Sequence, residues 1–378
     1  MPLLNLKPNQ WVQPATPLLA PLPLPANNPG NLKGFHYVPD GARAMPLVVV
    51  LHGCTQDAAS YDRGSGWSQL AERRGFAILY PEQQRSNNPG NCFNWFSAND
   101  SQRGMGEAAS IKAMVDAMVK AHDIDRSRIF VTGLSAGGAM ASVMLAAYPE
   151  TFAGGGIIAG IAYGCATDMG KAFDCMGGRA EENAAELGAK VRRASPHKGP
   201  WPKVSVWQGT ADSTVRPSNA DSIVRQWAFV HGLDPEQPSV SDNVDSYPHH
   251  VWLGADGKPA IEQYLITGMA HGTPLNPGTG EGESGVAGAH MLDAAISSTD
   301  RLADFWGIAP APAGAKTAKP AKASPMAEAR KPAKAARILE PITAALKRPR
   351  ASGPASSPIS SVQKTIEDAL RAAGLMGR

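Results

Sequence analysis

The sequence predicts an α/β fold, a mostly parallel sheet flanked by helices. Short apolar runs rich in β-branched residues alternate along the chain with segments whose apolar residues recur at helical spacing. Several of the runs are apolar throughout, which is typical of strands buried on both faces of a parallel sheet. Strands that alternate with helices in this way form sheets that are covered on both sides.

The first half of this alternation lies before residue 150. Leu47–Leu51 (LVVVL) and Phe76–Tyr80 (FAILY) are continuous apolar runs that predict strands. Glu107–His122 carries its apolar residues at helical spacing and predicts an amphipathic helix. Arg128–Thr132 (RIFVT) predicts a third strand, and the small residues of Ala136–Ala147 predict the helix that follows it.

The second half continues to residue 306. Strands are predicted at Gly156–Ala159, Lys203–Gln208 and Ile261–Ile266, again from short apolar runs. Helices are predicted at Ser218–His231 and His290–Trp306. Together these elements predict one α/β domain over residues 33–309.

The two ends of the chain differ in composition from this domain. Residues 1–32 are rich in proline and are expected to form an irregular lead. Residues 310–358 are rich in Ala, Pro and Lys, and such a segment is expected to be a disordered linker, because it offers too little apolar surface to offset its ordering entropy. Residues 359–378 have the spacing of a short amphipathic helix.

Charge and hydropathy exclude two classes of protein. The formal net charge is +3, but residues 316–350 hold ten Lys or Arg and two Glu, so the first 315 residues carry about −6. A nucleic-acid-binding body is therefore not indicated, and the basic tail is the candidate contact for a polymer granule or polyanion. No apolar run reaches the ~18 residues of a membrane span. The prolines of the first thirty residues interrupt any export signal, which favours the cytoplasm.

A G-x-S-x-G motif at residues 133–137 (GLSAG) follows the RIFVT strand and opens the helix after it. This strand–turn–helix context is the one in which a nucleophilic serine is held clear of the sheet. The helix amino terminus behind the serine favours developing negative charge. Ser135 is therefore the candidate nucleophile.

A nucleophilic serine needs a base and a carboxylate that orients it, and in this class of fold they follow the serine in the order Asp or Glu, then His. Asp212 follows the strand Lys203–Gln208, and His271 follows the strand Ile261–Ile266. Both thus lie beyond the carboxyl ends of buried strands, where open α/β sheets bind ligands. His290 is the rival base, but it is expected at the start of a helix.

A tetrahedral intermediate also needs two backbone N–H donors. One is expected from Ala136, directly after the nucleophile. The other is expected from the loop after the LVVVL strand, at Cys54, and His52 is expected to hold this loop through ring hydrogen bonds.

Five motifs, LHGCTQ, NCFNWF, GLSAGG, QGTADSTV and GMAHGTPL, resemble in this order the polyhydroxybutyrate depolymerase family of esterases, type 1 catalytic domain. The resemblance covers residues 33–307. It implies an α/β-hydrolase fold with Ser135, Asp212 and His271 as the triad and with Cys54 and Ala136 as oxyanion donors. It also makes Trp95 a candidate wall of the substrate cleft. Secreted members usually carry a signal peptide, a linker and a polymer-binding domain, and the ends of this chain depart from that pattern.

The four cysteines, Cys54, Cys92, Cys165 and Cys175, allow three disulfide pairings. The resemblance favours Cys54–Cys92, and the ten-residue spacing then favours Cys165–Cys175. Disulfides suggest an extracellular or other oxidising compartment, which conflicts with the lack of an export signal. No C-x-x-C pair occurs, and neither a metal nor an organic cofactor is expected.

These observations predict a serine esterase that hydrolyses short-chain polyhydroxyalkanoate, or its oligomers, through an acyl-enzyme. A feruloyl or acetylxylan esterase is the alternative that would share every catalytic residue. A protein of another class, one that binds granules or polyanions through its basic tail, is the second alternative.

Overall fold

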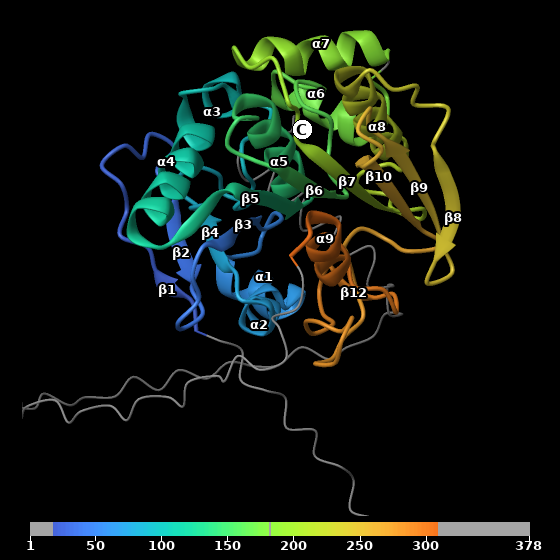
Figure 1. Ribbon diagram of the computed structural model, residues 1–378. Coiled ribbons are helices and arrows are strands. Elements are labelled where there is room, and N and C mark those ends of the chain that lie inside the picture. The colour runs from blue at the N-terminus through green and yellow to red at the C-terminus, as the bar shows by residue number, and fades with distance from the viewer. Residues whose placement is uncertain (1–17, 181–182, 309–378) are drawn as a thin grey trace, which may run out of the picture.

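The computed structural model describes residues 18–180 and 183–308, and they form a sheet of ten strands with helices on both faces (Figure 1). Six neighbouring strands of its middle are parallel, and an antiparallel pair extends each edge. The order across the sheet is β1 (Ala20–Pro21), β2 (Lys33–Tyr37), β4 (Ala77–Glu82), β3 (Met45–Leu51), β5 (Ile124–Leu134), β6 (Gly154–Ile158), β7 (Lys203–Gly209), β10 (Pro259–Ile266), β9 (Tyr247–Leu253) and β8 (Val240–Val244).

The helices divide into two layers, and each layer encloses its own apolar core against the sheet (Figure 1). One layer holds α3 (Ala98–Ser101), α4 (Gly106–Ala121), α5 (Ala136–Ala147), α6 (Met169–Met176), α7 (Ala184–Ala194) and α8 (Ser218–His231). The other holds α1 (Ala58–Ser65), α2 (Trp67–Arg74), α9 (Ser298–Trp306) and a small sheet of β11 (Thr273–Leu275) and β12 (Met291–Asp293).

Strand β3 illustrates why a central strand can be apolar throughout. All seven of its residues are buried. Val49 packs into the core beneath α4 and α5, whereas Val48 and Val50 pack into the core that includes α1 and α2. Because successive side chains of a strand point to opposite faces, both faces of a strand between two helix layers are buried, which favours apolar residues at every position.

The predicted strands and most predicted helices are present, with small differences at their ends. The helix predicted at His290–Trp306 is wrong in its first part. Residues Met291–Asp293 form strand β12, and α9 begins only at Ser298. The Ser297 side chain accepts a hydrogen bond from the Asp300 N–H and so caps α9 there. His290 and Ala295 have positive φ angles of 58° and 52°, which a continuous helix excludes.

The ends of the chain are described only in part. Ala20–Pro21 pairs with β2, so a short part of the lead expected to be irregular extends the sheet. The expectations for residues 310–358 and 359–378, and for the basic tail, lie outside the described residues. Within the described ranges no helix has the length and apolarity needed to cross a bilayer.

Candidate active site

Ser135 occupies a sharp turn between β5 and α5, as the G-x-S-x-G motif predicts. Its φ and ψ are 58° and −118°, a conformation that non-glycine residues rarely adopt, and its N–H is fixed by the Ile158 carbonyl at 2.9 Å. The turn passes so close to β3 that a Cβ on Gly137 would lie 2.2 Å from the Leu51 carbonyl oxygen. The glycine after the serine is therefore required by close backbone approach.

Asp212 and His271 meet although 59 residues separate them. The His271 Nδ1 lies 2.7 Å from Asp212 Oδ2, and Asp212 is 2 % exposed. The other carboxylate oxygen of Asp212 accepts hydrogen bonds from the N–H groups of Thr214 and Val215, at 2.8 and 2.9 Å. These donors fix the carboxylate, so Oδ2 holds the imidazole in one orientation. His271 and Ser135 line one cavity.

The loops that carry these two residues are tied to each other. Strands β7 and β10 are parallel neighbours, with Gly209 opposite Ile266. Beyond their ends, the Ala211 N–H donates to the Met269 carbonyl at 3.0 Å. A Cβ on Gly209 would lie 2.3 Å from that same carbonyl oxygen. Asp212 and His271 therefore meet because the two loops that carry them follow neighbouring parallel strands, β7 and β10.

The backbone N–H groups of Cys54 and Ala136 are both available for an oxyanion. Ala136 is the first residue of α5, where an N–H has no partner inside the helix. In the described part of the chain, neither N–H donates a hydrogen bond to another protein group. Cys54, Ser135 and Ala136 line the same apolar cavity. These residues thus surround one point at the carboxyl edge of the sheet.

His52 holds the loop that presents Cys54. It is fully buried, and its Nδ1–H donates to the Gly53 carbonyl at 2.8 Å while its Nε2 accepts from the Gln83 N–H at 3.1 Å. Burial lowers the pKa of this imidazole, because a charged ring would lose its solvation. A neutral His52 therefore joins the ends of β3 and β4 beneath the oxyanion loop.

Both expected disulfides are present. Cys54–Cys92 joins the oxyanion loop to the segment of residues 84–97, and Cys165–Cys175 joins α6 to the loop before it. The described residues contain no free cysteine. No group of three or more His, Cys, Asp or Glu within residues 18–180 and 183–308 is arranged to hold a metal ion.

Glu107, which the motifs did not single out, is a buried carboxyl that organises the loop behind Cys92. Its oxygens accept from Gln83 Nε2 at 2.5 Å, from the Asn94 N–H at 2.8 Å and from Asn94 Nδ2 at 2.7 Å. Burial raises the pKa of Glu107 to about 8 against the effect of these donors. A Glu at the start of an apolar helix was the only signal for it in the sequence.

Trp95 lies where the resemblance implies, in the wall of a narrow apolar cavity beside Ser135. Its ring stands edge-on to Phe96, with centroids 5.6 Å apart. The opposite wall is formed by Ile161 and by α6, which contributes Met169, Phe173 and Met176. Most of its lining is apolar, and Thr55, Asn88 and Ser135 are its polar side chains.

A second, wider cavity extends from Ser135 to the other side of His271. It is bounded by α1 and by residues 286–291, which include His290. The His290 Nδ1 lies 3.1 Å from the His271 carbonyl oxygen, and the two rings are edge-on with centroids 5.8 Å apart. His290 therefore braces the His271 loop, and Asp212 contacts His271 rather than His290.

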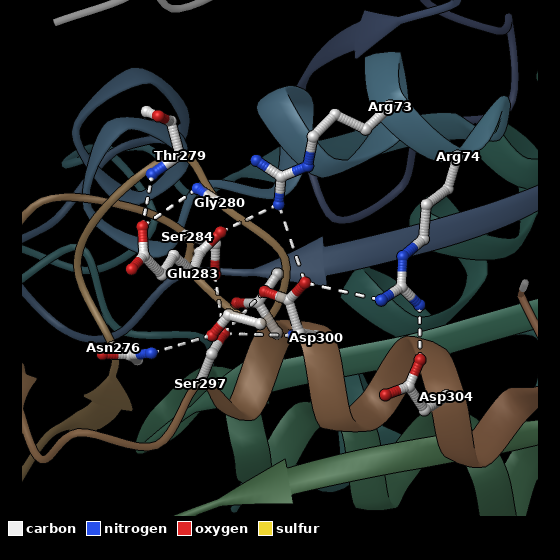
Figure 2. Close-up of polar contacts among 12 residues, drawn as sticks. Arg73, Arg74, Asn276, Thr279, Gly280, Glu283, Ser284, Ser297, Asp300 and Asp304 are labelled. Carbon is white, nitrogen blue, oxygen red and sulfur yellow. Dashed lines mark hydrogen bonds and ion pairs between the residues drawn. The ribbon is translucent and has the colours of Figure 1, made fainter. Parts of the chain in front are cut away.

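A polar network joins α2 and α9 to the loop of residues 276–284, which leads into this wall (Figure 2). Arg73 and Arg74 of α2 reach Asp300 of α9 at 3.6 and 3.5 Å, and Arg74 also reaches Asp304 at 2.6 Å. The Asp300 carboxylate accepts from Ser297 Oγ at 2.9 Å. The Arg73 side chain also donates to the Glu283 carbonyl, at 2.8 Å. The nearly buried pair of Arg74 and Asp300 thus joins α2 to α9, and Arg73 joins α2 to the loop that leads into the wall.

The same network continues into the loop before the wall (Figure 2). Ser284 Oγ lies 2.6 Å from Ser297 Oγ, and the Ser284 N–H donates to the Asn276 carbonyl. The Glu283 carboxylate accepts from the N–H groups of Thr279 and Gly280. No sequence motif marks this loop, because its role depends on contacts with α2 and α9.

Comparison with known proteins agrees with this geometry. The family model described as esterase PHB depolymerase matches residues 33–236. The poly(3-hydroxyalkanoate) depolymerase C of Paucimonas lemoignei is 50 % identical over 283 residues, which are 74 % of this chain and 68 % of that protein. An acetylxylan esterase of Coprinopsis cinerea is 33 % identical over 256 residues, 66 % of this chain and 67 % of that relative.

Among solved structures, an acetyl xylan esterase from Aspergillus awamori aligns with a TM-score of 0.66 and 25 % sequence identity. The alignment covers 78 % of this chain and 100 % of the other. The fold is therefore that of the α/β-hydrolases, and the matching family model spans more than half of the chain. The chain belongs to the PHB depolymerase family of esterases and is a carboxylic-ester hydrolase.

Proposed function

We propose that Ser135, His271 and Asp212 form the catalytic triad of this esterase. The observation that carries the proposal is the 2.7 Å contact between His271 Nδ1 and the buried Asp212 carboxylate, beside a cavity that also contains Ser135. The carboxylate accepts a hydrogen bond from Nδ1–H, so the ring proton stays on Nδ1 and the Nε2 lone pair is the basic site of the ring. A base held in this tautomer accepts the serine proton.

The reaction proceeds in two halves. Ser135 Oγ bonds to the ester carbonyl carbon as its proton passes to His271 Nε2, and the N–H groups of Cys54 and Ala136 stabilise the oxyanion. The C–O bond to the alcohol breaks, and the alkoxide takes the proton from His271. Water then attacks the acyl-enzyme, giving one proton to His271, and Ser135 leaves with that proton as the acid is released.

The proposed substrate is a short-chain polyhydroxyalkanoate, poly-3-hydroxybutyrate or its oligomers. The apolar cavity lined by Trp95, Ile161 and Phe173 supports this choice, because it matches an acyl chain with a methyl branch. The similarity to a poly(3-hydroxyalkanoate) depolymerase at 50 % identity supports it too.

The second candidate is a feruloyl or acetylxylan esterase activity, favoured by the acetylxylan esterase relatives and by the acetyl xylan esterase structure. It would use the same triad and oxyanion donors. The two differ in the acyl group and in the alcohol. Contact of the basic tail with granules or polyanions remains a proposal about residues outside the described ones.

The deciding experiment compares 3-hydroxybutyrate trimer, acetylated xylan oligomers and a feruloyl ester at equal enzyme concentration. The expected result is the highest kcat/KM for the hydroxybutyrate trimer. A higher value for either plant ester would replace the polyester proposal. A fluorophosphonate probe identifies the nucleophile independently, because mass spectrometry is expected to find the adduct on Ser135 and on no other serine.

A further inference from the structure

The wide cavity on the His271 side contains one charged side chain whose role the proposed chemistry does not explain. Arg63 of α1 lines it, and among the described residues that line either cavity beside Ser135 it is the only Lys, Arg, Asp or Glu. An arginine is charged at every pH at which such an enzyme operates. It therefore brings a permanent positive charge to this side of the cleft.

Arg63 differs from the two arginines that follow it in the chain. Arg73 and Arg74 point to Asp300 and Asp304 and fix the cavity wall (Figure 2). Arg63 makes no ion pair within the described ranges, and its side chain is exposed. Asp57 and Asp62 lie close enough to interact with its charge, but neither forms an ion pair with it, since Asp57 caps α1 and Asp62 accepts from Ser68 and Tyr80.

The place of Arg63 relative to the triad decides which part of a substrate it faces. His271 has to return a proton to the leaving alkoxide, so the alcohol half of the ester lies on the His271 side. Only the wide cavity contains His271, whereas the narrow apolar cavity does not. The alcohol half therefore occupies the wide cavity, between α1 and residues 286–291.

We propose that Arg63 binds a carboxylate carried by the leaving alcohol, so that the enzyme favours esters whose alcohol half ends in a free acid. In an acid-terminated hydroxyalkanoate oligomer this half is a 3-hydroxy acid, with its carboxylate a few bonds from the leaving oxygen. The planar guanidinium fork matches a carboxylate with two parallel hydrogen bonds. The inference rests on the proposed function for the roles of Ser135 and His271.

The opposing wall leaves room for such a group. Residues Ala287, Gly288 and Ala289 have small side chains, and a Cβ added to Gly288 would meet nothing within 4 Å. The wall itself is held in place, because the Val286 N–H donates to the Gly64 carbonyl at 2.9 Å, directly next to Arg63. The cation is thus presented on a fixed frame across from open space.

A purely structural reading assigns Arg63 to the last turn of α1, where a cation interacts favourably with the helix dipole. The two readings differ in what they predict for substrates. A structural role affects all esters alike. A binding role affects only esters whose alcohol half is an anion.

The test uses 3-acetoxybutyrate and its methyl ester, which share the same acetyl group and the same secondary alcohol but end in a carboxylate and in an uncharged ester. The initial rate of acetate release is measured, so that cleavage of the methyl ester bond is not counted. Both require only ester hydrolysis, so the test is valid even if the polyester proposal fails. The readout is the ratio of kcat/KM for the acid to kcat/KM for the methyl ester. This ratio cancels any loss of folded protein in a variant.

Arg63→Gln is expected to lower this ratio about two- to fivefold, the upper part of the range for a charge pair that is open to solvent. Arg63→Lys keeps the charge but loses the planar guanidinium group, and its ratio is expected to lie between those of the wild type and Arg63→Gln. Arg126→Gln is the matched control, since Arg126 is exposed on β5 near its amino end, away from the site, and it is expected to keep the wild-type ratio.

Salt gives a second readout. The wild-type ratio is expected to fall as NaCl rises from about 0.01 to 0.5 M, because screening weakens an exposed charge contact, and the ratio of Arg63→Gln is expected to stay constant. An equal ratio in wild type and Arg63→Gln, or the same loss in Arg126→Gln, overturns the inference. If the enzyme does not hydrolyse the hydroxybutyrate trimer but still prefers the acid to the methyl ester through Arg63, only the polyester proposal is overturned.

Discussion

Replacing Asp212 by Asn removes one charge from the site and keeps the size of the side chain. The orientation of the new amide follows from the contacts of Asp212. One carboxylate oxygen accepts from two backbone N–H groups, of Thr214 and Val215, and an NH₂ group cannot replace it there. The amide oxygen therefore takes that place, and the NH₂ group faces His271 Nδ1, 2.7 Å away.

This orientation reverses the tautomer of the base. An NH₂ donor requires Nδ1 of His271 to accept, so the ring proton moves to Nε2. A protonated Nε2 cannot take the proton of Ser135. The same substitution in a serine protease lowers kcat about 10⁴-fold, which corresponds to about 5.5 kcal/mol in the activation free energy. We expect a loss of that order here.

The variant is expected to fold, with a free energy of unfolding lower by about 1–3 kcal/mol, the range for a disturbed buried polar contact. Gln208 Nε2, which donates to Asp212 at 3.2 Å, keeps its contact to the Val215 carbonyl at 3.1 Å. The variant is therefore expected to fold but to hold His271 in the tautomer that cannot accept the serine proton.

The assay measures p-nitrophenyl butyrate hydrolysis at neutral pH beside thermal unfolding of the same samples. Asp256→Asn is the control, because it makes the same chemical change in the turn between β9 and β10 and is expected to alter kcat less than twofold. If folded Asp212→Asn keeps more than a tenth of the wild-type kcat, Asp212 does not orient the base.

Three further predictions concern other parts of the enzyme. Ser135→Ala is expected to lower kcat by several orders of magnitude, about 10⁶-fold in comparable triads, in a protein that unfolds at the same temperature. Loss of Cys54–Cys92 in the double Ala variant is expected to lower kcat, because the oxyanion donor loosens, whereas loss of the second disulfide, which ends in α6, is expected to raise KM. His52→Gln is expected to have a lower free energy of unfolding than the wild type at about pH 8, and the difference is expected to be smaller at about pH 5. Each is checked by steady-state kinetics or by denaturant unfolding across pH.

The sign of the His52 prediction follows from its lowered pKa. The unfolded chain takes up a proton below the ordinary value of 6.5, and the folded protein does not, so acid favours unfolding by up to about 1.4 kcal/mol per pH unit. Stability from a neutral His52 is therefore present above pH 6.5 and is lost as pH falls toward the lowered pKa. A constant difference between wild type and His52→Gln across this range would contradict the reasoning.

The sequence by itself determined the elements that depend on local patterns. Continuous apolar runs such as Leu47–Leu51 indicated strands buried on both sides, because only a strand between two helix layers excludes polar residues from both faces. The G-x-S-x-G motif indicated the turn at Ser135, because the crowding of Gly133 by Gly137 arises within the motif itself, whereas the crowding of Gly137 by Leu51 depends on the sheet. Asp212 and His271 were singled out because each lies shortly beyond the carboxyl end of a buried strand.

Only the tertiary structure decided the contacts made between distant segments. The helix predicted from His290 was wrong because residues 291–293 pair with β11, and such pairing overrides a helical pattern. Glu107 and the wall held by Arg73 and Asp300 left no motif, because each depends on partners far away in the chain. The same holds for Arg63, whose position beside the triad follows from the packing of α1 against residues 286–291 and not from its neighbours in sequence.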